Sequence, residues 1–84
     1  MAAKENPTPN LQLAFGRALR QVRTDRGLSQ EELAFESEVH RTYISELERG
    51  QKNPSLATVE RLSHALGVKV SELIAGAESL LKRR

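Results

Sequence analysis

Four polar side chains, Arg41, Thr42, Ser45 and Glu46, lie within about two helical turns of one another. The planar fork of an arginine matches the O6 and N7 acceptors of guanine, and such a pair provides about 1–3 kcal/mol of discrimination between bases. Threonine offers a hydroxyl group to a base and a methyl group to thymine, while glutamate accepts from the N4 amino group of cytosine. These side chains predict direct reading of DNA bases, with Ser45 either touching a base edge or allowing close approach.

Each of these side chains also has a plainer interpretation. Arg41 fits a phosphate contact or a solvated position, although base reading is the interpretation preferred here. Glu46 is repelled by phosphates, so a solvent-facing role is equally well supported.

A second group of side chains suits the DNA backbone. Arg49, Lys52 and Asn53 follow the segment and form an expected phosphate clamp. Tyr43 either offers its hydroxyl group to a phosphate or packs against a neighbouring helix. His40 either contacts a phosphate, more tightly when its imidazole is protonated, or is an exposed turn residue.

These side chains need two short helices joined by a turn to position them. Ser29 and Glu32 form a Ser-x-x-Glu capping box, which predicts a helix starting just after Ser29. Leu33 and Ala34 are its expected buried residues. Val39 is apolar and is expected to fill the angle between the two helices.

The second helix is expected to begin near His40 or Arg41. Ile44 and Leu47 are three residues apart and therefore share its buried face. Gly50 follows, and glycine just past a helix is the common left-handed stop. Two helices with a short turn predict a helix-turn-helix unit, whose second helix reads base edges with its N-terminal residues.

The sequence resembles the Cro/repressor-type helix-turn-helix regulators of bacteria and phages, and among them the small single-domain regulators that include restriction–modification controller proteins. The resemblance covers roughly residues 11 to 75. It is carried by Leu28-Ser29-Gln30-Glu31-Glu32-Leu33-Ala34, Arg41-Thr42-Tyr43-Ile44-Ser45, Leu47-Glu48-Arg49-Gly50, Asn53-Pro54-Ser55-Leu56 and Ala65-Leu66-Gly67-Val68.

The resemblance implies a transcription regulator that binds double-stranded DNA as a homodimer. In relatives that dimerise, the fifth helix and its surroundings often form the interface. It assigns backbone phosphates to Ser29 and Gln30, at the positive end of the first helix of the motif. It also implies a structural ion pair between Arg23 and Glu48. The chain departs from the family at Glu38, where glycine is usual and the turn often needs a positive φ.

His40 is a second departure, because a serine, threonine or aspartate cap is common there. Histidine is a poor helix cap, so the start of the reading helix is expected to be less firmly held.

Three further helices complete an all-α, five-helix domain. The first starts after Asn10 and ends at Gly27. Its apolar stripe consists of Leu11, Phe15, Ala18, Leu19 and Val22. The fourth follows the cap residue Ser55 and stops at Gly67. Its apolar face consists of Leu56, Val59, Leu62, Ala65 and Leu66.

The fifth helix is expected to start at the cap Ser71, with Leu73 and Ile74 apolar. Val68 and Val70 are expected to pack under the preceding turn. The helix either ends at Gly76 or extends to Leu81, and the pair Leu80 and Leu81 would then dock on the domain or on a second copy. We therefore expect an N-terminal arm over residues 1–9, the DNA-binding domain over 10–76, and a helical extension or tail over 77–84.

The composition narrows the function classes. The chain has 84 residues, no cysteine and a net charge of +2, so it can form one small domain without a disulfide or a thiolate zinc site. It has neither an apolar run that could span a bilayer nor a signal peptide, and a cytoplasmic location is expected. Its scattered carboxylates and two separated histidines predict no enzyme, no metal site and no cofactor.

The charge is unevenly distributed, since residues 28–48 hold six Glu and one Arg. This acidic stretch cannot lie flat on phosphates. An alternative function is a protein-binding module of the antitoxin or adaptor type on the same fold. Phe35 favours it, because an aromatic side chain on that helix could be exposed.

Overall fold

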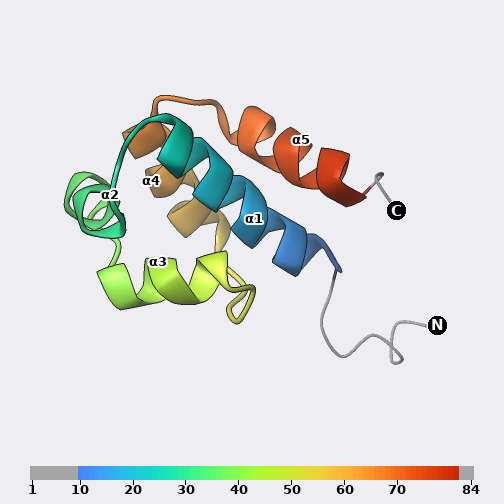
Figure 1. The fold of residues 1–84 in the computed structure, drawn as a ribbon, viewed down its shortest axis with the longest axis horizontal. Helices are drawn as coiled ribbons and strands as arrows, with labels where there is room; N and C mark the ends of the chain where they lie inside the picture. The colour runs from blue at the N-terminus through green and yellow to red at the C-terminus, as the bar shows by residue number, and fades with distance from the viewer. Residues whose placement is uncertain (1–9, 82–84) are drawn as a thin grey trace.

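The computed structural model describes residues 10–81, which form five helices and the turns and loops between them. The helices are α1 (Asn10–Asp25), α2 (Gln30–Ser37), α3 (Arg41–Glu48), α4 (Leu56–Leu66) and α5 (Val70–Leu81), as Figure 1 shows. No strand occurs within these residues, which confirms the all-α, five-helix prediction. The expected arm over residues 1–9 lies outside the described part, as do residues 82–84.

The N-terminal caps of α2 and α4 are the serine residues that the sequence predicts. Ser29 Oγ accepts from the backbone N–H of Glu32 at 3.0 Å, and the backbone N–H of Ser29 donates to Glu32 Oε1 at 2.8 Å. Ser55 Oγ accepts from the backbone N–H of Thr58 at 3.1 Å at the start of α4. These bonds satisfy backbone donors that the first turn of a helix leaves free.

The start of α5 differs from the prediction. The helix begins at Val70, and Ser71 is part of its first turn, so Ser71 is not its cap. The carboxylate of Glu72 accepts from the backbone N–H of Lys69 at 2.8 Å instead. Glu72 is the third residue of the helix, and its carboxylate reaches back to the residue before the helix, as in one half of a capping box.

The core lies between α1 and the other helices. Helix α1 packs against α5 on one side and α3 on the other, while α2 packs against α3 and α4. Seven large side chains are almost completely buried: Leu19, Leu33, Ile44, Leu47, Leu62, Leu66 and Leu73. Every helix contributes to this core, so the domain folds around one apolar centre.

Three apolar residues expected to be buried are exposed. Leu11 is 44% exposed, Leu56 is 84% exposed and Val70 is 36% exposed. Each lies in the first turn of its helix, where side chains tilt towards the helix N-terminus and away from the packed middle of the helix. Helical periodicity predicts which face of a helix a residue lies on. It does not predict how much of the helix length is covered by the helices packed against that face.

Helix α5 runs through Gly76 to Leu81, which is the longer of the two predicted alternatives. Ala77 is fully buried, and Leu80 and Leu81 are half-buried against the core. The two leucines therefore dock on the domain itself. No helix of residues 10–81 combines the length and the apolar character that crossing a bilayer requires.

Gly16 is a residue whose role the sequence did not reveal. It lies where α1 passes the end of α3, and a Cβ atom added there would be 2.2 Å from the carbonyl oxygen of Leu47 and 3.0 Å from that of Glu48. These are backbone atoms, so a side chain cannot be accommodated by a rotamer change. The close approach of α1 to α3 requires glycine at this position.

We predict that Gly16→Ala lowers the free energy of unfolding by about 1–3 kcal/mol, because the methyl group pushes α1 and α3 apart. Urea denaturation followed by circular dichroism measures this loss. Gly76→Ala is the matched control, since its Cβ would meet Ala18 Cβ at an ordinary 3.7 Å. That change raises stability by about 0.5–1 kcal/mol, as expected for alanine within a helix. Equal effects of the two changes would contradict the close-approach argument.

Candidate nucleic-acid interface

The turn between α2 and α3 is held in a strained conformation. Glu38 has φ 60° and ψ 29°, the left-handed conformation expected where relatives carry glycine. For a residue with a side chain this costs about 1–2 kcal/mol. Val39 follows and is buried as predicted, so the turn is fixed by one apolar anchor beside a strained residue.

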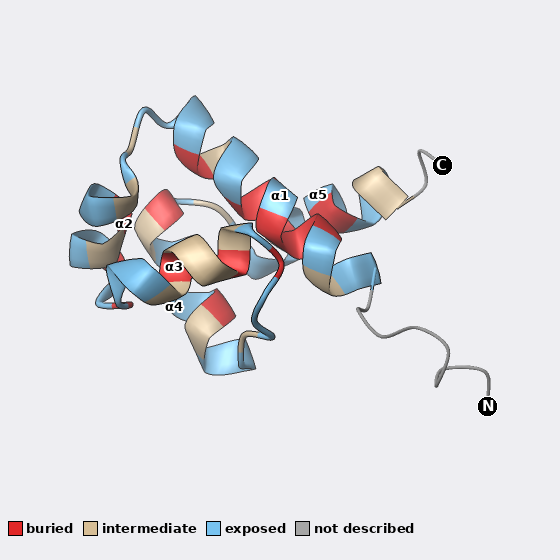
Figure 2. Cartoon of the chain, turned by 60° about the horizontal axis from the view of Figure 1, so that its bottom comes forward, coloured by how far each residue is buried: buried red, intermediate tan, exposed pale blue. Residues whose placement is uncertain are grey.

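Helix α3 presents a buried face to the core and a polar face to solvent. Ile44 and Leu47 are buried, as predicted. Arg41 and Thr42 are exposed at the start of the helix, while Ser45 and Glu46 are half-buried one turn later. Figure 2 shows the exposed beginning of α3 beside α2. The four side chains expected to read bases therefore extend along the helix from its accessible end.

The start of α3 has little support from its own cap. His40 occupies the cap position, and its side chain makes no capping hydrogen bond. The side chain of Arg41 lies beside that of Glu31, with Arg41 Nε 4.0 Å from Glu31 Oε2, and both side chains are more than half exposed. Such an exposed pair contributes about 0–1 kcal/mol, so Arg41 can leave it for a stronger partner.

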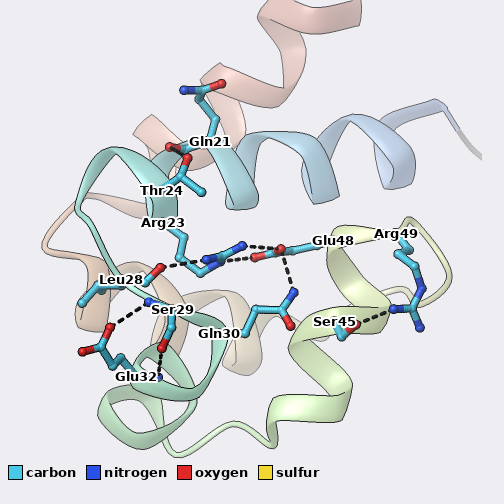
Figure 3. Close-up of polar contacts among 10 residues, drawn as sticks. All are labelled: Gln21, Arg23, Thr24, Leu28, Ser29, Gln30, Glu32, Ser45, Glu48 and Arg49. Atoms are coloured by element: carbon cyan, nitrogen blue, oxygen red, sulfur yellow. Dashed lines mark hydrogen bonds and ion pairs between the residues drawn. The ribbon is translucent and has the colours of Figure 1, made fainter.

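Arg23 connects α1 to α3 through a buried ion pair. Its Nε donates to Glu48 Oε2 at 2.6 Å and its Nη2 to Glu48 Oε1 at 2.9 Å, as Figure 3 shows. Arg23 is only 9% exposed. The hydrogen bond to Glu48 raises the pKa of Arg23 above its ordinary value, although burial acts in the opposite direction. The guanidinium group therefore stays charged in the folded protein.

The same network includes two further groups. Arg23 Nη1 donates to the carbonyl oxygen of Leu28 at 2.7 Å, and Gln30 Nε2 donates to Glu48 Oε1 at 3.0 Å. Gln30 was expected at a phosphate, and in the free protein its amide group is bound to Glu48 instead. One of its two amide hydrogens is committed, so the other can still point outwards.

Two other expected phosphate contacts are engaged within the protein. The hydroxyl group of Ser29 caps α2. Arg49 Nη1 donates to Ser45 Oγ, and Arg49 Nη2 donates to Gln51 Oε1 at 3.3 Å. Figure 3 shows the guanidinium group of Arg49 reaching back to Ser45. In the free protein Arg49 therefore lies against the expected base-reading residues.

The remaining phosphate candidates are distributed differently. His40, Lys52 and Asn53 are exposed. Tyr43 is half-buried and packs against the core, which agrees with the packing alternative for its ring. No cluster of three or more His, Cys, Asp or Glu residues within residues 10–81 could hold a metal ion.

Gln12 is a site-supporting residue that the sequence did not indicate. Its Nε2 donates to the carbonyl oxygen of Gly50 at 2.8 Å, across 38 positions of the chain. The bond ties Gly50, two residues beyond the end of α3, to the first turn of α1. A local pattern contains no signal for such a long-range contact.

The chain is similar in sequence to known proteins over most of its length. Residues 19–73 match the family model described as helix-turn-helix. The control protein C.BamHI of Bacillus amyloliquefaciens is 50% identical over 68 residues, which make up 80% of this chain and 84% of that protein. The control protein C.MunI of a Mycoplasma species is 37% identical over 70 residues, which make up 82% of this chain and 95% of that protein.

Solved structures give a similar result. The clp gene regulator ClgR of Corynebacterium glutamicum has a TM-score of 0.84 and 41% identity, over 90% of this chain and 81% of that one. The restriction-modification controller protein C.AhdI of Aeromonas hydrophila has a TM-score of 0.73 and 47% identity, over 74% of this chain and 94% of that one. The sequence relatives and the solved structures both include control or controller proteins, and residues 19–73 match the helix-turn-helix family.

We predict that Glu48→Ala lowers the free energy of unfolding by about 3–5 kcal/mol, because it leaves the buried charge of Arg23 without a partner. The double variant Arg23→Met, Glu48→Leu should lose less than Glu48→Ala, since it removes both charges and keeps apolar volume. Urea denaturation of both variants and the wild type measures the difference. A loss of only about 0–1 kcal/mol in Glu48→Ala would mean that the pair behaves as an exposed one.

Proposed function

Because the chain belongs to the helix-turn-helix family, we propose that it is a sequence-specific DNA-binding transcription regulator that reads base edges through α3. The observation that carries this proposal is the division of α3 into two faces. Ile44 and Leu47 fix the helix in the core, while Arg41 and Thr42 project into solvent from its first turn. A helix fixed in this way can enter the major groove with its N-terminal residues facing the bases.

Base reading is assigned to Arg41, Thr42, Ser45 and Glu46. Arg41 gives up only a weak exposed pair with Glu31 when it binds a base. Its donors match guanine, and Thr42 suits a neighbouring base pair. Ser45 Oγ accepts from Arg49, and its own O–H can still donate to a base edge.

The phosphate contacts surround α3. Lys52 and Asn53 follow α3 and are both exposed. Arg49 joins them as a phosphate contact once it leaves Ser45. Ser29 and Gln30 lie at the N-terminus of α2, where free backbone N–H groups favour an anion. His40 and the hydroxyl group of Tyr43 complete the set. These contacts set the position of α3 on the duplex and add affinity for any sequence.

A homodimer would present two copies of α3 to successive major grooves, with half-sites about 34–36 Å, or about 10–10.5 base pairs, apart. An apolar surface suited to this contact surrounds Leu56. Leu11, Phe15, Val59 and Ile74 line a groove on one side of it, and Val70 borders it on the other side. We assign the dimer contact to this surface, because an exposed apolar patch costs free energy until a partner covers it.

Occupancy of a promoter by such a dimer would repress transcription by occlusion. We propose that the protein's own concentration sets this occupancy.

A second candidate function is a protein-binding module on the same fold. The observation that favours it is Phe35, whose side chain is 83% exposed on α2.

We predict that Arg41→Ala relaxes sequence preference at one base position by about 1–3 kcal/mol. Lys52→Ala should weaken binding to all sequences alike and reduce the salt slope of log K by about one. Selection from random duplex DNA at near-physiological salt, followed by binding titrations, measures both effects. Arg17→Ala is the control, since Arg17 lies beside α5, on the side of α1 away from α3. Failure of the folded wild type to enrich any sequence would contradict specific reading.

We predict that Leu56→Asp converts the dimer into a monomer, because it places a charge in the apolar contact. Sedimentation equilibrium measures the mass, and titration with a single half-site shows whether DNA reading is retained. Phe35→Ser is the matched control, because it removes a side chain that is equally exposed but lies outside the proposed contact. A mass unchanged by Leu56→Asp would assign the dimer contact to another surface.

A further inference from the structure

The loop between α3 and α4 carries two of the proposed phosphate contacts, Lys52 and Asn53. Both side chains are exposed. Within the described part of the chain, residues 52–54 make no backbone–backbone hydrogen bond. The direction in which the loop leaves α3 therefore depends on the residues just before it.

The peptide unit that joins Gly50 to Gln51 is held at both of its polar groups. The backbone N–H of Gln51 donates to the carbonyl oxygen of Glu46 at 2.9 Å, and the carbonyl oxygen of Gly50 accepts from Gln12 Nε2 at 2.8 Å. A peptide unit is planar, so a bond on each side fixes its orientation. Gly50 has φ 75° and no side chain, and such a residue rotates more freely than others when these bonds are lost.

Gln12 is not needed to hold α1 against α3. The two helices already meet closely at Gly16, and the ion pair between Arg23 and Glu48 joins them further along. Gln12 adds a polar contact to the carbonyl group that orients the start of the loop. Its bond therefore acts on the loop more than on the packing of the helices.

We propose that Gln12 is a positioning residue for DNA binding, which holds the loop so that Lys52 and Asn53 meet the phosphates. This inference rests on the proposed DNA-binding function and adds a residue of α1 to it. Phosphate contacts fix the position of the protein on the duplex and add affinity for any sequence. A loop that is already ordered loses less freedom on binding, so Gln12 raises affinity without touching the DNA.

The surroundings of Gln12 agree with this role. Gln12, Asn53 and Pro54 line the same groove, so the side chain of Gln12 lies beside the loop as well as at its start. Figure 1 shows this loop next to the N-terminal end of α1. The groove also belongs to the proposed dimer contact, so the effect of Gln12 is best measured on DNA that one protomer occupies.

The test compares Gln12→Met with the wild type on a duplex that holds a single half-site of the sequence that the wild type selects. Methionine keeps the length of the side chain and removes its N–H donor. We expect binding to weaken about three- to tenfold for all sequences alike, in line with the loss of one hydrogen bond. The salt slope of log K should fall by up to about one. Circular dichroism checks that the variant is folded.

Gln21→Met is the matched control. It makes the same change on α1, where the glutamine bonds Asp25 of the same helix at 2.9 Å, and it should bind the half-site like the wild type. Gln12→Glu is a second variant without the donor. A carboxylate in the first turn favours the helix, so this variant should stay folded and bind at least as weakly as Gln12→Met.

A double-variant cycle separates positioning of the loop from a general structural effect. Gln12→Met should cost less affinity in a Lys52→Ala background than alone, because the loop then has one phosphate contact fewer to position. Arg41 lies at the other end of α3. The losses from Gln12→Met and Arg41→Ala should therefore add in log K.

Two results would overturn the positioning role and leave the proposed function standing. One is a half-site affinity and a salt slope of Gln12→Met equal to those of the wild type. The other is an equal loss from Gln12→Met with and without Lys52→Ala, as a merely structural effect would give. If the folded wild type selects no sequence, the proposed function fails and this inference fails with it.

Discussion

The ion pair between Arg23 and Glu48 is the interaction on which the geometry of the motif depends. It joins α1 to the end of α3, and two further bonds extend it to Leu28 and Gln30. The ion pair and these two bonds therefore connect three helices, with Arg23 on α1, Glu48 on α3 and Gln30 on α2. A buried charge left unpaired is costly, so the pair enforces a single arrangement of α3. The proposed base reading needs such an arrangement, because a small shift of the helix would move Arg41 away from the base assigned to it.

Further contacts of α1 reinforce this arrangement at the same end of α3. The absence of a side chain at Gly16 lets α1 approach the carbonyl oxygens that end α3, and Gln12 binds the carbonyl oxygen of Gly50. The far end of α3 is thus fixed firmly, whereas its beginning has no side-chain cap at His40. A reading helix fixed at its end and accessible at its beginning suits the proposed insertion of its N-terminal residues into a groove.

Charge divides the surface into regions with different roles. The exposed carboxylates of α2 repel phosphates from the outer face of that helix, while Lys52, Asn53 and Arg49 supply groups beyond α3 that can meet phosphates. The apolar surface around Leu56 includes none of the α2 carboxylates and reaches Asn53 at its edge. The proposed DNA contact and the proposed dimer contact would therefore lie on neighbouring parts of one small domain.

Local sequence determined the helices, most of their caps and the buried positions Leu33, Val39, Ile44 and Leu47, because these depend on neighbours within one or two turns. The left-handed turn at Glu38 and the partnership of Arg23 with Glu48 came from the family pattern. Only the tertiary structure decided the exposure of Leu11, Leu56 and Val70, the need for glycine at position 16, and the engagement of Gln30 and Arg49 within the protein. These features depend on where helices distant in sequence end and how closely they approach, and helical periodicity carries no information about either.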